Sequence, residues 1–283
     1  MREEYRTVNG VTLHCVVAGT GPLVVLLHGF PEAAYSWRAQ IPALAERFTV
    51  VAPDMRGYNT SSKPKGVENY HIERLVEDVV ALIHSFGVEH AAVVGHDWGG
   101  LVAWTTALLR PDVVRQLVIL NCPHPRVFQQ HLLTNPVQAR RSWYIGFFQL
   151  PWLPEWVLRR NDYAFLEHAF RDDAVHPDNF SDADIAAYKT SASQQGALTA
   201  MVNYYRALFR APSLRVLADL DPVVRPPTLV VWGEQDFALG NELLDGLPRY
   251  VPDLTVRRIA DASHWVQQDR PDLVNRYLAG FLA

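Results

Sequence analysis

The stretch Ala91-Ala92-Val93-Val94-Gly95-His96-Asp97-Trp98-Gly99-Gly100 decides the fold of this chain. Its first four residues are apolar and include two β-branched valines, which predicts a short buried strand. The residues from Gly99 to Leu109 are mostly small or aliphatic, which predicts a helix. Between them, Asp97 has one glycine two residues before it and another two residues after it. This spacing suits a sharp strand-to-helix turn that presents the Asp97 side chain at the end of a sheet, although alone it also fits a turn without chemistry.

The segments on either side of this turn alternate between strands and helices. A hairpin is predicted around Asn9-Gly10, because Asn-Gly suits a two-residue turn with positive φ. Apolar residues recur at helical spacing over residues 72–86. We therefore predict an α/β fold with a mostly parallel central sheet flanked by helices. Buried strands are expected at residues 22–27 and 49–52, further strands at residues 91–94, 116–120, 228–232 and 254–259, and a closing helix at residues 265–282.

The alternation stops between Cys122 and about Asp221. This segment contains no buried-strand pattern and is instead helical in pattern and rich in Trp, Tyr and Phe. We predict a helical cap over residues 124–221, inserted into a core made of residues 1–123 and 222–283. A separate helical domain is the alternative, but both flanks of the insertion are needed to complete one sheet.

A loop and two further residues combine with Asp97. The loop His28-Gly29-Phe30 follows an early strand, Asp236 follows the strand that ends near Gly233, and His264 follows the strand that ends at Ile259. Nucleophile, acid and histidine in this chain order are expected of an α/β-hydrolase fold. Asn121 occupies another place where the acid sometimes stands, but an amide cannot serve as that acid.

The carboxylate at the turn narrows the reaction. A serine that attacked saturated carbon would give an ether, which activated water could not cleave, whereas a carboxylate gives a hydrolysable ester. Asp97 therefore predicts chemistry at an epoxide or a carbon–halogen bond. His264 would activate water, and Asp236 would hold its imidazole. The backbone N–H groups of Phe30 and Trp98 are the expected oxyanion donors.

These residues resemble the soluble, bacterial-type epoxide hydrolases of the α/β-hydrolase fold, and the resemblance runs nearly end to end. It is dense in His28-Gly29-Phe30-Pro31-Glu32, in the turn from Gly95 to Gly100, and in Ser263-His264-Trp265-Val266-Gln267. One departure is Asn59, where the family usually has glycine; asparagine tolerates the left-handed backbone that this position requires.

The resemblance implies two proton-donating tyrosines in the cap. Tyr144 matches the first in the stretch Tyr144–Gln149, and Tyr205 matches the second in Asn203-Tyr204-Tyr205-Arg206. An epoxide leaves as an alkoxide, which a neutral phenol can protonate. The aromatic cap also implies an apolar pocket, and we expect the substrate to contact Trp37, Phe30, Trp98 and Phe148.

Rival functions remain open. A haloalkane dehalogenase needs a second N–H donor besides Trp98, for which Trp143 and Trp152 are candidates, and a fluoroacetate-type dehalogenase normally has arginine at position 98. A non-catalytic binding protein of the same fold usually lacks a residue of the catalytic triad or a proton donor. Here the triad of Asp97, Asp236 and His264 is complete, and both tyrosines are present. A serine esterase is disfavoured because no serine occupies the turn.

The composition of the chain argues against several other classes of protein. The chain has 283 residues, 49% of them hydrophobic, and a net charge of −4 without basic clusters, which gives no support for nucleic-acid binding. Cys15 and Cys122 predict no disulfide framework, and neither a signal sequence nor a membrane span is apparent. We expect a cytoplasmic protein that uses an apolar epoxide and water, with no metal or cofactor; its oligomeric state is open.

Overall fold

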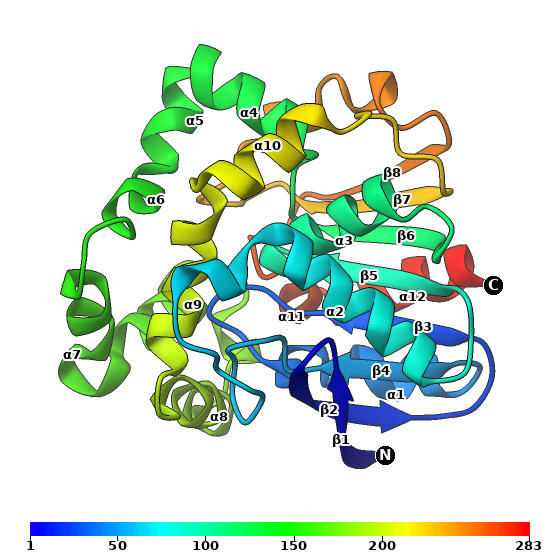
Figure 1. Cartoon of the computed structure of the whole chain (residues 1–283), viewed down its shortest axis with the longest axis horizontal. Helices are drawn as coiled ribbons and strands as arrows, with labels where there is room; N and C mark the ends of the chain where they lie inside the picture. Colours follow the sequence, from blue (N-terminus) through cyan, green and yellow to red (C-terminus); the bar gives the residue numbers. More distant parts are fainter.

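The computed structural model describes residues 1–283 and is built on one eight-stranded sheet (Figure 1). The strand order is β1-β2-β4-β3-β5-β6-β7-β8. β2 pairs antiparallel with β1 and with β4, and all other pairs are parallel. The predicted fold class is thus confirmed. The strands are β1 (Arg2–Val8), β2 (Val11–Ala18), β3 (Leu23–Leu27), β4 (Thr49–Pro53), β5 (Ala91–His96), β6 (Val114–Leu120), β7 (Thr228–Gly233) and β8 (Leu254–Ile259).

Helices cover both faces of this sheet, which is why β3 and β5 are apolar throughout. Val24 and Leu26 face one core cluster, which also contains residues of α1 (Gln40–Ala45) and α12 (Pro271–Leu282). The neighbouring Val25 and Leu27 belong to the larger cluster, with α2 (Ile72–Ser85) and α3 (Trp98–Leu109). Successive side chains of a strand point to opposite faces, so one apolar run serves two cores.

Seven helices lie between β6 and β7, in the segment where the sequence predicts the cap. Figure 1 shows them grouped at one end of the molecule, beyond the ends of the parallel strands. We keep the name cap for residues 124–221. Its helices are α4 (Pro125–Thr134), α5 (Pro136–Arg141), α6 (Trp143–Phe147), α7 (Leu153–Glu167), α8 (Asp182–Ser193), α9 (Ala197–Leu208) and α10 (Ala211–Asp219).

Local backbone signals explain two boundaries. Asn9 and Gly10 have φ of 44° and 74° and join β1 to β2 with Val8 opposite Val11, so the predicted hairpin is confirmed. The prediction of a single closing helix was wrong: α11 (Val266–Asp269) and α12 are separated at Arg270, whose φ is −131°. Arg270 precedes Pro271, and the proline ring disfavours helical backbone in the residue before it.

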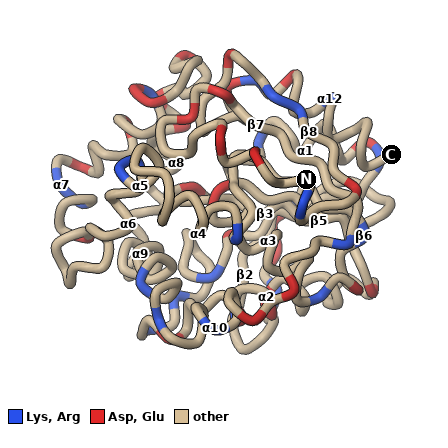
Figure 2. Tube along the Cα trace, turned by 90° about the horizontal axis from the view of Figure 1, so that it is seen from above, with Lys and Arg blue, Asp and Glu red and all other residues tan.

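Basic and acidic residues are scattered along the chain trace (Figure 2). No helix combines the length and the apolar character that crossing a bilayer requires.

Candidate active site

Asp97 lies in the turn between β5 and α3 with φ of 48° and ψ of −118°. Such backbone is strained for a residue with a side chain and is typical of functional sites. The flanking glycines make the turn feasible, because a Cβ on Gly95 would collide with the backbone of Gly99, and one on Gly99 would collide with the carbonyl of Leu27. The sharp turn that the glycine spacing predicts is thus present.

The two oxygens of the Asp97 carboxylate have different neighbours. The backbone N–H of Phe30 donates to Oδ1 at 2.8 Å. Oδ2 lies 3.7 Å from Nε2 of His264. No hydrogen bond joins the N–H of Trp98 to this carboxylate. Gly29 allows the close approach, since a Cβ there would lie 2.5 Å from Cβ of Asp97.

His264 is held by Asp236, as the chain order predicts. Its Nδ1–H donates to Oδ2 of Asp236 at 2.7 Å. The backbone N–H groups of Ala238 and Leu239 each donate to Oδ1 of the same carboxylate at 2.8 Å. The two backbone donors hold the Asp236 carboxylate, and the carboxylate in turn orients the imidazole.

Asn121 has a positioning contact that sequence reasoning missed. Its Nδ2 donates to Oδ2 of Asp236 at 2.8 Å, and its Oδ1 accepts from the N–H of Gly233 at 2.8 Å. The sequence places Asn121 at a strand end where an acid can stand, but not beside Asp236. That proximity follows from the pairing of β6 with β7.

The charges of Asp97, Asp236 and His264 shift the pKa values of His264 and Asp236. Burial acts to lower the pKa of His264, but the charge and hydrogen bond of Asp236, with the charge of Asp97, raise it to about 9. Burial acts to raise the pKa of Asp236, and the charge of His264 with the hydrogen bonds to it lowers that pKa below its usual value. The resting imidazole is therefore protonated at neutral pH, and Asp236 is ionised.

A second buried pair, Glu32 and His96, links three loops of the site and was also missed as a unit. His96 Nδ1–H donates to Glu32 Oε2 at 2.8 Å, and Nε2–H donates to the carbonyl of His264 at 2.9 Å. Glu32 also accepts from the N–H of Gly29 at 2.9 Å. Burial acts to raise the pKa of Glu32, but His96 and these hydrogen bonds lower it to about 2. Glu32 lies in the motif His28–Glu32 and His96 in the turn Gly95–Gly100, but the sequence did not predict that the two side chains pair.

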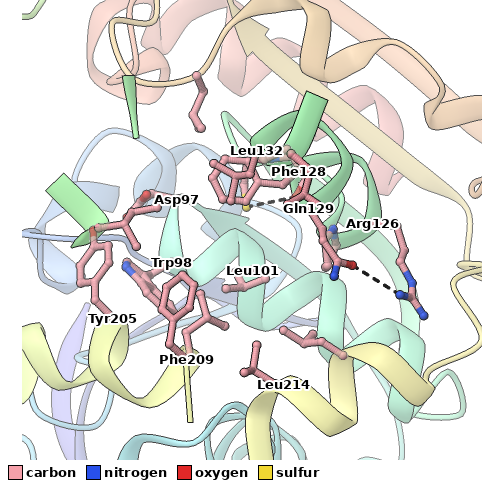
Figure 3. A pocket seen from close by; sticks show the side chains of 18 of the residues that line it. Asp97, Trp98, Leu101, Arg126, Phe128, Gln129, Leu132, Tyr205, Phe209 and Leu214 are labelled. Carbon is pink, nitrogen blue, oxygen red and sulfur yellow. Dashed lines mark hydrogen bonds between the residues drawn. The ribbon is translucent and has the colours of Figure 1, made fainter. Parts of the chain in front are cut away.

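Tyr144 of α6 and Tyr205 of α9 line the same cavity as Asp97. Their ring centres are 6.0 Å apart, and Tyr205 packs edge-on against Trp98 at 4.9 Å. Figure 3 shows Tyr205 beside Asp97 and Trp98. Burial, together with the charge of Asp97, raises the pKa of both phenols well above its usual value. Both hydroxyls are therefore protonated and able to donate.

The cavity has a volume of about 330 Å³ and extends from Asp97 between α3 and the cap helices α4, α9 and α10. Fifteen of its 20 lining residues are hydrophobic. Figure 3 shows Asp97, Trp98 and Tyr205 at one end and Arg126 with Gln129 at the other. Such a cavity suits a small apolar molecule whose reactive group lies at Asp97.

Three of the four residues predicted to contact the substrate are absent from the lining of this cavity. Trp37 is fully buried in the core cluster that includes residues of α1 and α12, so the prediction that it contacts the substrate was wrong. Phe30 and Phe148 are absent from the lining; their rings pack against Tyr205, with centres 5.4 and 4.7 Å away. Apolar pattern identifies a buried aromatic residue but not the face of the sheet on which it lies. Trp98 does line the cavity.

The fold and this arrangement define an α/β hydrolase with a carboxylate at the nucleophile turn. A family model described as the alpha/beta hydrolase fold matches residues 22–271. The AB hydrolase superfamily protein YfhM of Bacillus subtilis is 41% identical, over 99% of this chain and 97% of that protein. Human epoxide hydrolase 4 is 38% identical, over 97% of this chain and 76% of its own length.

A solved structure extends the similarity to three dimensions. The Bacillus megaterium epoxide hydrolase in complex with an inhibitor matches with a TM-score of 0.92 and 38% identity, over 99% of both chains. This chain belongs to the epoxide hydrolases of the α/β-hydrolase fold, which confirms the family and the enzyme class predicted from the sequence.

Proposed function

We propose that this protein hydrolyses an apolar epoxide to a vicinal diol through an ester on Asp97. Oδ2, the oxygen that faces His264, attacks a ring carbon and the ring C–O bond breaks. The resulting alkoxide takes a proton from Tyr144 or Tyr205. Oδ1, already 2.8 Å from the Phe30 N–H, becomes the carbonyl oxygen of the ester.

The second half of the reaction restores the carboxylate. His264, which first loses its resting proton to solvent, takes a proton from water, and the hydroxide adds to Cγ of Asp97. The negative charge then develops on Oδ1, where the N–H of Phe30, joined by that of Trp98, stabilises it. The bond from Cγ to Oδ2 breaks, the departing alkoxide takes the proton of the hydroxyl just added to Cγ, and the diol leaves. The proton that His264 took from water replaces the one that the tyrosine gave, and the imidazole regains its resting proton from solvent. The sum is epoxide plus water to diol.

The observation that favours an epoxide over a halide as the substrate is that Tyr144 and Tyr205 both line the cavity that contains Asp97. A departing halide needs N–H donors, but Trp143 and Trp152 lie on the surface with 67% and 71% of their area exposed. Trp98 is the only tryptophan in the cavity lining. A haloacid would need a cation beside the nucleophile, whereas Arg126 lies at the far end of the cavity (Figure 3).

A side-by-side assay with an aryl epoxide, a bromoalkane and fluoroacetate tests this proposal. The wild-type protein is expected to turn over the epoxide much faster than either halide. Tyr144→Phe and Tyr205→Phe should each slow ester formation, and the double variant should abolish epoxide turnover, because the alkoxide then lacks its donor. Undiminished activity in the double variant would contradict the proton-donor roles, and a preference for the bromoalkane would contradict the proposed function.

The pH dependence of ester hydrolysis tests the link between Asp97 and His264. The charge of Asp97 helps to raise the pKa of His264 to about 9, and esterification removes that charge. The pKa in the ester intermediate should therefore lie below 9, and hydrolysis should speed up with pH as the imidazole loses its proton. Single-turnover rates between pH 6 and 10 are the measurement, with ester formation in the same samples as the internal control. A midpoint at or above 9 would contradict the link.

The proposed small-molecule partners are an apolar epoxide and water. We also propose that the protein is cytoplasmic, as expected from the sequence.

A further inference from the structure

Three of the eight tryptophans lie on the protein surface. Trp143, Trp152 and Trp156 are 67%, 71% and 53% exposed, and none of them lines the catalytic cavity. The other five are at most 6% exposed. An exposed indole leaves a large apolar area in water, and several close together mark a binding surface.

These three side chains come from one part of the cap. Trp143 begins α6, and Trp152 and Trp156 lie one helical turn apart at the start of α7. Leu150, 44% exposed, lies between them in the chain. Figures 1 and 2 view the molecule at right angles, and in both α5, α6 and α7 lie at the same end.

Basic side chains surround the tryptophans. Residues 136–160 contain four arginines and one acidic residue, Glu155, whereas the whole chain has a net charge of −4. Glu155 is already paired with Arg206 at 2.7 Å. Arg140, Arg159 and Arg160 are exposed and have no carboxylate within ion-pair distance, and Arg160 lies 4.7 Å from the ring centre of Trp156. The segment therefore has a free positive charge.

We propose that this Trp–Arg patch, formed by the three tryptophans with Arg140, Arg159 and Arg160, docks on an anionic lipid surface. Indole rings favour the headgroup level of a bilayer, where the apolar ring and the polar N–H are both satisfied. Arginines bind lipid phosphates and are attracted by anionic headgroups. A second copy of the chain fits less well, because a two-fold interface sets each patch against itself and brings arginines close to arginines.

Vesicle co-sedimentation of the full chain tests the proposal. Wild-type protein should bind vesicles of phosphatidylcholine with phosphatidylglycerol, and binding should weaken at high salt and without the anionic lipid. Two triple variants, Trp143→Ser/Trp152→Ser/Trp156→Ser and Arg140→Gln/Arg159→Gln/Arg160→Gln, should each bind at least about tenfold more weakly. Removing three exposed arginines elsewhere, in Arg115→Gln/Arg249→Gln/Arg276→Gln, is the matched control and should change binding much less.

Three outcomes would overturn the proposal. Wild-type protein could fail to bind the anionic vesicles, or the control variant could lose as much binding as the two patch variants. Alternatively, sedimentation could show a wild-type dimer that dissociates in the tryptophan variant without vesicle binding, in which case a second copy covers the patch. Thermal unfolding and turnover of a water-soluble epoxide, both expected to be unchanged, establish that each variant is folded.

Discussion

Replacing Asp97 with alanine is expected to lower kcat/KM for an epoxide by on the order of 10⁴-fold or more, since the variant has no nucleophile. His264 and Asp236 remain in place, but activated water then has no ester to attack. Steady-state turnover of an aryl epoxide is the measurement. The lining of the cavity is otherwise unchanged, so an epoxide should still bind.

Asp173→Asn is a matched control for the Asp97 variant. Asp173 is an acid close enough for the charges of His264 and Asp236 to affect its pKa, yet it has no part in the proposed reaction. Its variant should stay within about threefold of wild-type turnover, because no step of the proposed reaction uses this carboxyl group. An equal loss in both variants would mean that a change in local charge, rather than a missing nucleophile, explains the effect.

His264→Gln is expected to trap the reaction halfway. Ester formation needs Asp97 and the tyrosines, so the variant should still react once, but without the base the ester should hydrolyse about 10²–10⁴-fold more slowly. Intact-protein mass spectrometry after epoxide addition should show a mass increase equal to one substrate molecule. The double variant Asp97→Ala/His264→Gln should show none. An adduct in the double variant, or none in His264→Gln, would contradict these roles.

Much of the fold could be predicted from local patterns. β8 begins and ends where the strand predicted at residues 254–259 does, and the Asn9-Gly10 turn forms the predicted hairpin. Asn59 adopts the left-handed backbone expected there, with φ of 41°. The break at Arg270 follows from Pro271, whose ring disfavours helical backbone in the residue before it, and the prediction of one helix over residues 265–282 did not include this effect.

The residues of the site could also be predicted from the sequence only in part. Asp97, Asp236 and His264 follow strand ends in a recognisable order, and parallel strands bring those ends together. The pairing of Glu32 with His96, the support of Asp236 by Asn121 and the burial of Trp37 on the other side of the sheet depend on distances between loops far apart in the chain. Local spacing contains no such information. The exposure of the three cap tryptophans is likewise a tertiary property.

The central claim is that the first bond to the substrate comes from Asp97 and not from water. A single-turnover reaction in ¹⁸O-labelled water, with enzyme in excess over epoxide, tests it most directly. Because Oδ2 leaves with the diol and the oxygen of water stays on Asp97, the first diol should contain only unlabelled oxygen, and label should enter the protein. Labelled oxygen in that first diol would contradict the covalent route.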